Sequence, residues 1–170
     1  NYAIKLTTWA SPGAIPGSNT SPAYTLTGSG YIDGSGSPLQ EGSGTLVIDN
    51  SGNNVFSGGV TINGGAVQVG NNDSNGNLPG SIINNRSLIF ARSDSPTVNT
   101  SISGTGSFTQ AGTGGTLVLS GNNAFTGGVL VTNSSTLKVG SSSALGGGSG
   151  TITVASGSTL DINNNSQSKT

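Results

Sequence analysis

Six carboxylates are the side chains of this chain best suited to acid–base or metal chemistry: Asp33, Glu41, Asp49, Asp73, Asp94 and Asp161. Cleaving a glycosidic bond requires two carboxyl groups about 5–10 Å apart, one of them with a raised pKa. Asp33, Glu41 and Asp49 could approach one another if neighbouring segments pack together. The chain has no His and no Cys, so a serine nucleophile would lack its usual base and thiol chemistry is excluded. We therefore expect solvated turn carboxylates in a non-enzymatic chain without catalytic residue, metal or cofactor.

The low charge of the chain limits the classes of molecule that it can bind. Only 6% of the 170 residues are charged and the net charge is −1, whereas about a quarter of an ordinary soluble domain is charged. Binding to nucleic acid or to an anionic membrane surface needs clustered cations, and the five Lys and Arg residues are scattered. No apolar run approaches the length of a membrane span. The composition therefore predicts neither nucleic-acid binding nor membrane insertion.

A nine-residue block occurs twice, as GNNVFSGGV at 52–60 and GNNAFTGGV at 121–129. A glycine-rich anion site would need a helix N-terminus or a flanking Lys, and neither is expected here. The structural interpretation is a corner in which an Asn pair tolerates positive φ and ladders with a neighbouring segment, a Phe points inward, and a Gly pair makes the next bend. The predicted corner residues are Asn53, Asn54, Phe56, Gly58, Gly59, Asn122, Asn123, Phe125, Gly127 and Gly128.

Short alternating apolar runs must position these corners. They lie at 45–48, 66–69, 87–90, 116–119 and 136–139, and alternation of this kind is typical of strands. No window of helical length lacks Gly or β-branched residues, which disfavour helices. The chain is therefore predicted to be all-β.

The runs and blocks together form two copies of a unit of about 70 residues, at about 27–97 and 101–166. A β-sandwich and a β-solenoid both have short strands at this spacing. The very short strands, the matched apolar positions and the Gly and Asn corners favour a parallel β-solenoid of about seven or eight coils over residues 23–170. Residues 1–22 do not fit the unit and are expected to form a cap, a linker or an assembly strand, for which the candidate residues are Tyr2, Ile4, Leu6 and Trp9.

The second unit also carries a resemblance. It reads Gly-Thr-Leu-Val-Leu at 115–119, then the block at 121–129, Thr-Leu-Lys-Val-Gly at 136–140 and Thr-Ile-Thr-Val-Ala at 151–155. This order resembles the autotransporter-associated β-strand repeat, found in the passenger regions of secreted bacterial surface proteins. The resemblance implies a right-handed parallel β-helix outside the cell or at the bacterial cell surface.

Three functions remain open from the sequence. The first is a structural rod that displays or adheres, with neighbouring repeats of the same protein, a host surface or glycans as partners. The second is a filament subunit that self-associates end to end through its N-terminal strand, because little charge repulsion opposes stacking. The third is a carbohydrate-binding or carbohydrate-cleaving β-helix.

Overall fold

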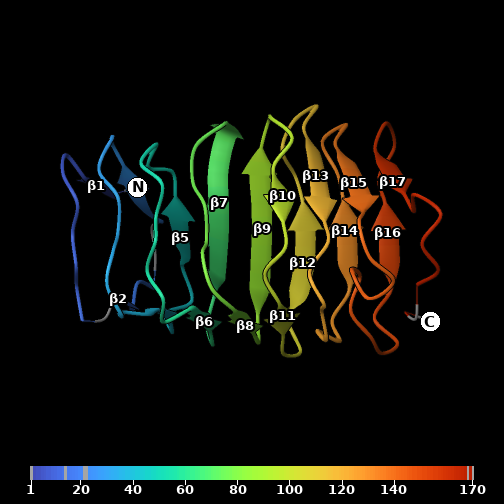
Figure 1. Ribbon diagram of the computed structural model, residues 1–170, viewed down its shortest axis with the longest axis horizontal. Coiled ribbons are helices and arrows are strands. Elements are labelled where there is room, and N and C mark those ends of the chain that lie inside the picture. The colour runs from blue at the N-terminus through green and yellow to red at the C-terminus, as the bar shows by residue number, and fades with distance from the viewer. Residues whose placement is uncertain (1, 14, 21–22, 168, 170) are drawn as a thin grey trace.

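A computed structural model describes residues 2–13, 15–20, 23–167 and 169, and these residues form a β-solenoid. Within these residues there are seventeen strands and no helix, and every strand pairing is parallel. The coils follow one another along the long axis of the molecule, from the N-terminal to the C-terminal end (Figure 1). The prediction of an all-β parallel solenoid is confirmed.

The strands lie in three sheets that run along the rod. The first face holds an eight-stranded sheet made of β1 (Tyr2–Lys5), β3 (Tyr24–Thr27), β5 (Thr45–Ile48), β7 (Ala66–Asp73), β9 (Ser87–Arg92), β12 (Ser107–Gln110), β14 (Val129–Val131) and β16 (Ile152–Val154). The second face holds β10 (Thr97–Val98), β13 (Thr116–Leu119), β15 (Thr136–Val139) and β17 (Thr159–Asp161). The third face holds β2 (Ile15–Gly17), β4 (Pro38–Gln40), β6 (Val60–Ile62), β8 (Ile82–Asn84) and β11 (Ile102–Ser103).

Register sets the size of a coil. Tyr24 pairs with Leu46, Leu46 with Val67 and Val67 with Leu88, so one coil takes about 21 residues, within the range of solenoid repeats. Because side chains alternate between the two sides of a strand, paired residues share a direction. The apolar side chains of each run therefore stack above one another inside the rod.

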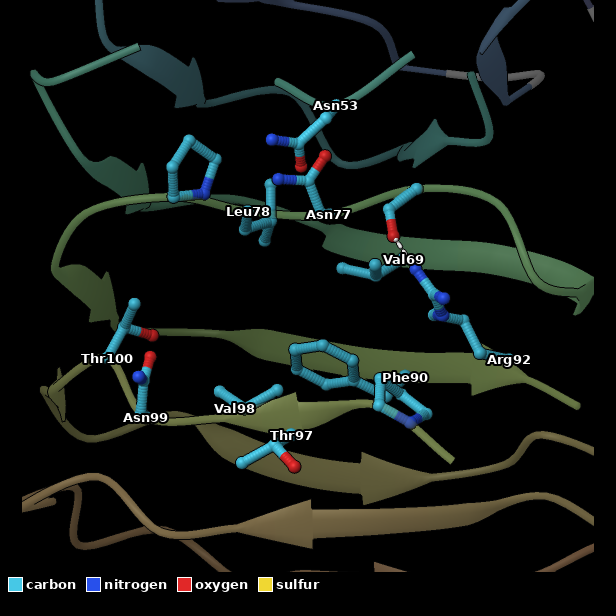
Figure 2. A pocket seen from close by; sticks show the side chains of 13 residues that line it. Asn53, Val69, Asn77, Leu78, Phe90, Arg92, Thr97, Val98, Asn99 and Thr100 are labelled. Atoms are coloured by element: carbon cyan, nitrogen blue, oxygen red, sulfur yellow. Dashed lines mark hydrogen bonds between the residues drawn. The ribbon is translucent and has the colours of Figure 1, made fainter. Parts of the chain in front are cut away.

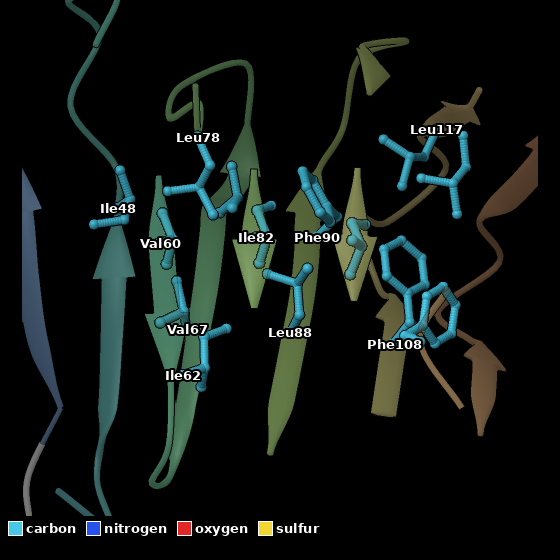
Figure 3. Close-up of a cluster of buried hydrophobic side chains, with 14 of the residues drawn as sticks. Ile48, Val60, Ile62, Val67, Leu78, Ile82, Leu88, Phe90, Phe108 and Leu117 are labelled. Carbon is cyan, nitrogen blue, oxygen red and sulfur yellow. The ribbon is translucent and has the colours of Figure 1, made fainter. Parts of the chain in front are cut away.

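These inward positions make one continuous core (Figure 3). Val67, Leu88 and Phe108 are at most 1% exposed. The rings of Phe90, Phe108 and Phe125 follow one another, with centroids 5.7 Å and then 5.9 Å apart. Distances of this size are typical of favourable aromatic pairs. The core is thus a stack of layers, each contributed by one coil.

The two repeat units do not occupy the same faces. In the fifth coil the chain visits all three faces in order, from β9 to β10 to β11, and returns to the first face at β12. The first block follows β5 and therefore lies on the second face. The second block follows β13 and lies on the third face, where Ala124 N donates to Ile102 O of β11 at 2.8 Å. The second unit is thus turned by one face relative to the first.

The described residues of the segment 1–22 continue the solenoid towards its N-terminal end. β1 pairs with β3, β2 pairs with β4, and Ala10 bridges to Ile32. Tyr2, Ile4 and Trp9 are 59%, 49% and 61% exposed, while Leu6 packs partly buried against the core. The candidate assembly residues therefore belong to the first coil, and β1 has a strand partner on one side.

Candidate functional site

Asn54 and Asn123 join three coils each. Ile32 N donates to Asn54 Oδ1 at 2.9 Å, and Asn54 Nδ2 donates to Asn77 O at 3.1 Å. In the second unit Ile102 N donates to Asn123 Oδ1 at 2.8 Å, and Asn123 Nδ2 donates to Ala144 O at 2.7 Å. Both side chains are buried, at 1% and 5% exposed. The same amide role thus recurs on two different faces.

Their neighbours Asn53 and Asn122 point outwards and are exposed. Asn122 Oδ1 accepts a hydrogen bond from Ser143 Oγ at 2.8 Å. None of the four asparagines of the blocks has a positive φ, which departs from the expected left-handed corner. The reason is that the backbone after each pair continues the coil-to-coil ladder: Val55 N donates to Ile32 O at 2.8 Å, as Ala124 N does to Ile102 O.

The Phe and Gly positions of the blocks lie where coils touch. Phe56 and Phe125 are buried in the core, at 1% and 0% exposed. A Cβ on Gly58 would lie 2.6 Å from Ser35 O, and one on Gly127 would lie 2.2 Å from Gly106 O. Gly59 has a φ of 72°, whereas Gly128 has no positive φ. The Gly pairs therefore permit close backbone approach, and only one of the four residues needs a left-handed backbone.

Sequence reasoning missed two buried glutamines. Gln40 ends β4 and its Nε2 donates to Gly42 O and Gly44 O at 2.9 and 3.0 Å. Gln110 ends β12 and its Nε2 donates to Gly115 O at 3.4 Å. Both close the turn before the next strand and are at most 1% exposed. The available signal was a Gln four or five residues before the Gly-Thr-Leu-Val of each unit.

The carboxylates are distributed along the rod. Asp49 lies beside Asp73, and burial together with the Asp73 carboxylate raises the pKa of Asp49. Asp94 forms an ion pair with Arg92, whose Nη2 lies 2.6 Å from Asp94 Oδ2, and hydrogen bonds from Arg92 lower the pKa of Asp94. Asp161 lies 3.8 Å from Lys138 Nζ.

Asp33 and Glu41 are the two remaining carboxylates. Asp33 Oδ1 accepts from Gly34 N at 2.6 Å, and Glu41 is exposed in the turn after β4. Among the described residues no three carboxylates gather where they could hold a metal ion. No helix in that part of the chain is long and apolar enough to cross a membrane.

The geometry defines a class of protein: a parallel β-solenoid whose recurring Asn, Gln, Phe and Gly residues hold successive coils together. Two segments, residues 40–69 and 108–139, match the family model of the passenger-associated-transport-repeat. The chain thus carries two segments that are similar to this passenger repeat. Each matched segment contains one block and one of the two buried glutamines.

One similar protein is the adhesin BmaC autotransporter of Brucella suis biovar 1 (strain 1330), which is 43% identical over 56 residues. That match covers 33% of this chain and 2% of the adhesin, so the chain spans a small part of its relative. No solved structure matches the chain. The resemblance to autotransporter passenger repeats is therefore confirmed, while neither match supports a filament subunit or a carbohydrate-binding or carbohydrate-cleaving β-helix.

Proposed function

We propose that this chain is a non-enzymatic structural segment of a bacterial surface protein, a rod that displays or contributes to adhesion. The observation that carries the proposal is that both passenger repeats stack into one continuous core. The stack is maintained by residues that do the same work in each unit, such as Asn54 and Asn123. The polar residues of the repeat therefore serve coil-to-coil cohesion.

The partners in this proposal are neighbouring coils of the same protein. β1 and β16 are the outer strands of the eight-stranded sheet, and each pairs with one described strand. Ile152 and Val154 of β16 are 37% and 42% exposed. Unpaired strand edges with apolar side chains favour the addition of further strands. Further coils stacked on either end would bury these residues as the inner coils bury theirs.

An epitope tag between Gly148 and Ser149 tests the location. Both residues are exposed and lie in a turn between β15 and β16, so an insertion there leaves the sheets intact. We expect antibody to label intact bacteria that produce the tagged protein, and external protease to remove the label. Labelling that requires permeabilised cells would contradict a surface location. A tag in a cytoplasmic protein of the same cells controls for leakage.

A further inference from the structure

In the described part of the chain, the ladder of hydrogen bonds on the second face is interrupted between the fourth and fifth coils. The coils on either side of this interruption are joined: Asn54 N donates to Asn77 Oδ1 at 2.8 Å, and Val118 N donates to Pro96 O at 2.9 Å. Between these two joints, no backbone hydrogen bond connects residues 77–80 with residues 96–100 in the described structure. The interruption lies where β10 begins the four-stranded sheet.

A cleft of about 300 Å³ opens at this interruption (Figure 2). Its apolar floor includes Pro79 and Val98, which are partly exposed, together with Val69 and Phe90 of the core, which are 0% and 3% exposed. Its rim includes Asn53, Thr97 and Asn99, all of them exposed. The volume lies at the lower end of the range for small-ligand sites, and an apolar floor with a few polar groups is their usual character.

The rim presents hydrogen-bonding groups that the protein leaves available. The side chains of Asn53, Thr97 and Asn99 make no hydrogen bond to another described residue. The hydroxyl of Thr100, which also lines the cleft, is enclosed and has no partner within the described part of the chain. Amides and hydroxyls both donate and accept, so this rim suits a ligand whose groups do the same.

The cleft carries no free charge. Its single cation, Arg92, donates from Nε and Nη2 to Asp94 at 2.9 and 2.6 Å and from Nη1 to Gly76 O. A guanidinium paired in this bidentate way is already neutralised and fixed in direction. A carboxylate or phosphate on a ligand would find no unpaired cation, so the chemistry favours a neutral ligand.

We propose that this cleft binds a neutral sugar residue, whose hydroxyls pair with the amide and hydroxyl rim while its C–H face lies over the apolar floor. The proposal deepens the surface function proposed above and rests on it only for the exposure of the cleft outside the cell. An extended peptide fits less well. β10 has two residues, and Pro79 and Pro96 at the cleft lack the N–H donors that an added strand would need.

The test is a glycan array of neutral and acidic saccharides probed with the purified 170-residue chain, followed by NMR titration with the methyl glycoside of the best neutral hit. We expect binding to neutral glycans, with amide shifts centred on residues 97–100. Asn53→Ala and Asn99→Ala should each weaken binding at least fivefold. Asn122→Ala, the same block position on a face without the cleft, should bind as the original chain does.

Thermal melts of all three variants verify that they fold. No binding to any neutral glycan, binding restricted to acidic glycans, equal binding by Asn53→Ala, or shifts at residues 97–100 produced only by extended peptides would each overturn the proposal. Surface labelling of intact cells is a separate measurement. A failed array with positive labelling therefore rejects the sugar site and leaves the surface function standing.

Discussion

The amide of a buried asparagine side chain can join neighbouring coils by hydrogen bonds at a place where no strand pairs with another. The side chain of Asn54 accepts a hydrogen bond from one coil and donates one to the next. The side chain of Asn77 in turn bonds the backbone of Asn54: its Oδ1 accepts from Asn54 N at 2.8 Å, and its Nδ2 donates to Asn54 O at 2.9 Å. Hydrogen bonds of this kind contribute modestly when made, but a buried partner left alone is costly. At the residue scale, stability should therefore depend on a few internal asparagines.

Asn54→Ala should lower the free energy of unfolding by about 1–3 kcal/mol, because it leaves the buried Ile32 N and the part-buried Asn77 O without their partner. Asn123→Ala should cost a similar amount through Ile102 N and Ala144 O. Urea denaturation followed by circular dichroism measures both. The exposed neighbour gives the control, since Asn53→Ala should change stability by less than about 0.5 kcal/mol. Equal effects at positions 53 and 54 would contradict this role of the amide.

Asp49 and Asp94 should respond to pH with opposite signs. Burial and Asp73 raise the pKa of Asp49 above 3.8, so the folded state holds this proton more tightly and ionisation costs stability as pH rises through that range. Arg92 lowers the pKa of Asp94 below 3.8, so the stability it contributes is present above pH 3.8 and is lost as pH falls through the folded pKa.

Asp49→Asn should therefore stabilise the protein at pH 7, and Asp94→Asn should destabilise it, each by less than about 1 kcal/mol because both side chains are partly solvated. Both differences should shrink at pH 3. Urea midpoints at the two pH values give the comparison. A stabilised Asp94→Asn protein at pH 7 would show that its ion pair contributes nothing net.

At the element scale, the same block is built with different backbones on two faces. Gly59 has a φ of 72° and a Cβ there would lie 2.5 Å from Ser81 O. Gly128, its equivalent, has no positive φ and its Cβ would lie 3.1 Å from Thr151 O. Of these two glycines, only Gly59 combines a positive φ with a close backbone oxygen, and both would strain an added side chain.

Gly59→Ala should accordingly cost about 1–3 kcal/mol, and Gly128→Ala should cost clearly less. Thermal melts of the two proteins provide the measurement. Gly147→Ala serves as the matched control, because no atom beyond its chain neighbours lies within 4 Å of its added Cβ and its φ is not positive. If Gly59→Ala and Gly128→Ala melted together, the left-handed corner would carry no strain.

The strands were predictable because their signal is local. Alternation at 45–48 and 116–119 corresponds to β5 and β13 with their full bounds. The run at 66–69 does not reveal that β7 continues to Asp73, because that extension depends on Asp73 pairing with Arg92 across a register shift. Gln40 and Gln110 were also missed. A polar residue at a strand end is ordinarily expected to be solvated, and only the folded turn shows that these two side chains are buried.

At the scale of the whole molecule, protection from exchange should fall from the middle of the rod to its ends. A solenoid coil contacts mainly its neighbours, so the outer coils have one neighbour and the inner coils two. β7 and β9 contain inward side chains that are buried, whereas every residue of β1 and β16 is exposed. Hydrogen exchange followed by mass spectrometry should show slow amides in β7 and β9 and fast ones in β1 and β16. Uniform protection along the chain would indicate unfolding in a single step.

The relation between the two units could not be read from the sequence. An offset of about 70 residues gives the length of the unit and says nothing about the length of a coil, which depends on hydrogen bonds between distant residues. One coil takes about 21 residues. A unit of about 70 residues is therefore longer than three whole coils by a fraction of a coil. The second block therefore comes to lie on the next face, as the positions of β6 and β14 in different sheets demonstrate.

This turn between the units determines which of the two blocks a flat surface can reach. The exposed Asn53 and Asn122 look out from different faces, so a planar surface lying against the rod meets one of them and never both. A flat partner that covers the cleft beside Asn53 therefore leaves the block at Asn122 uncovered.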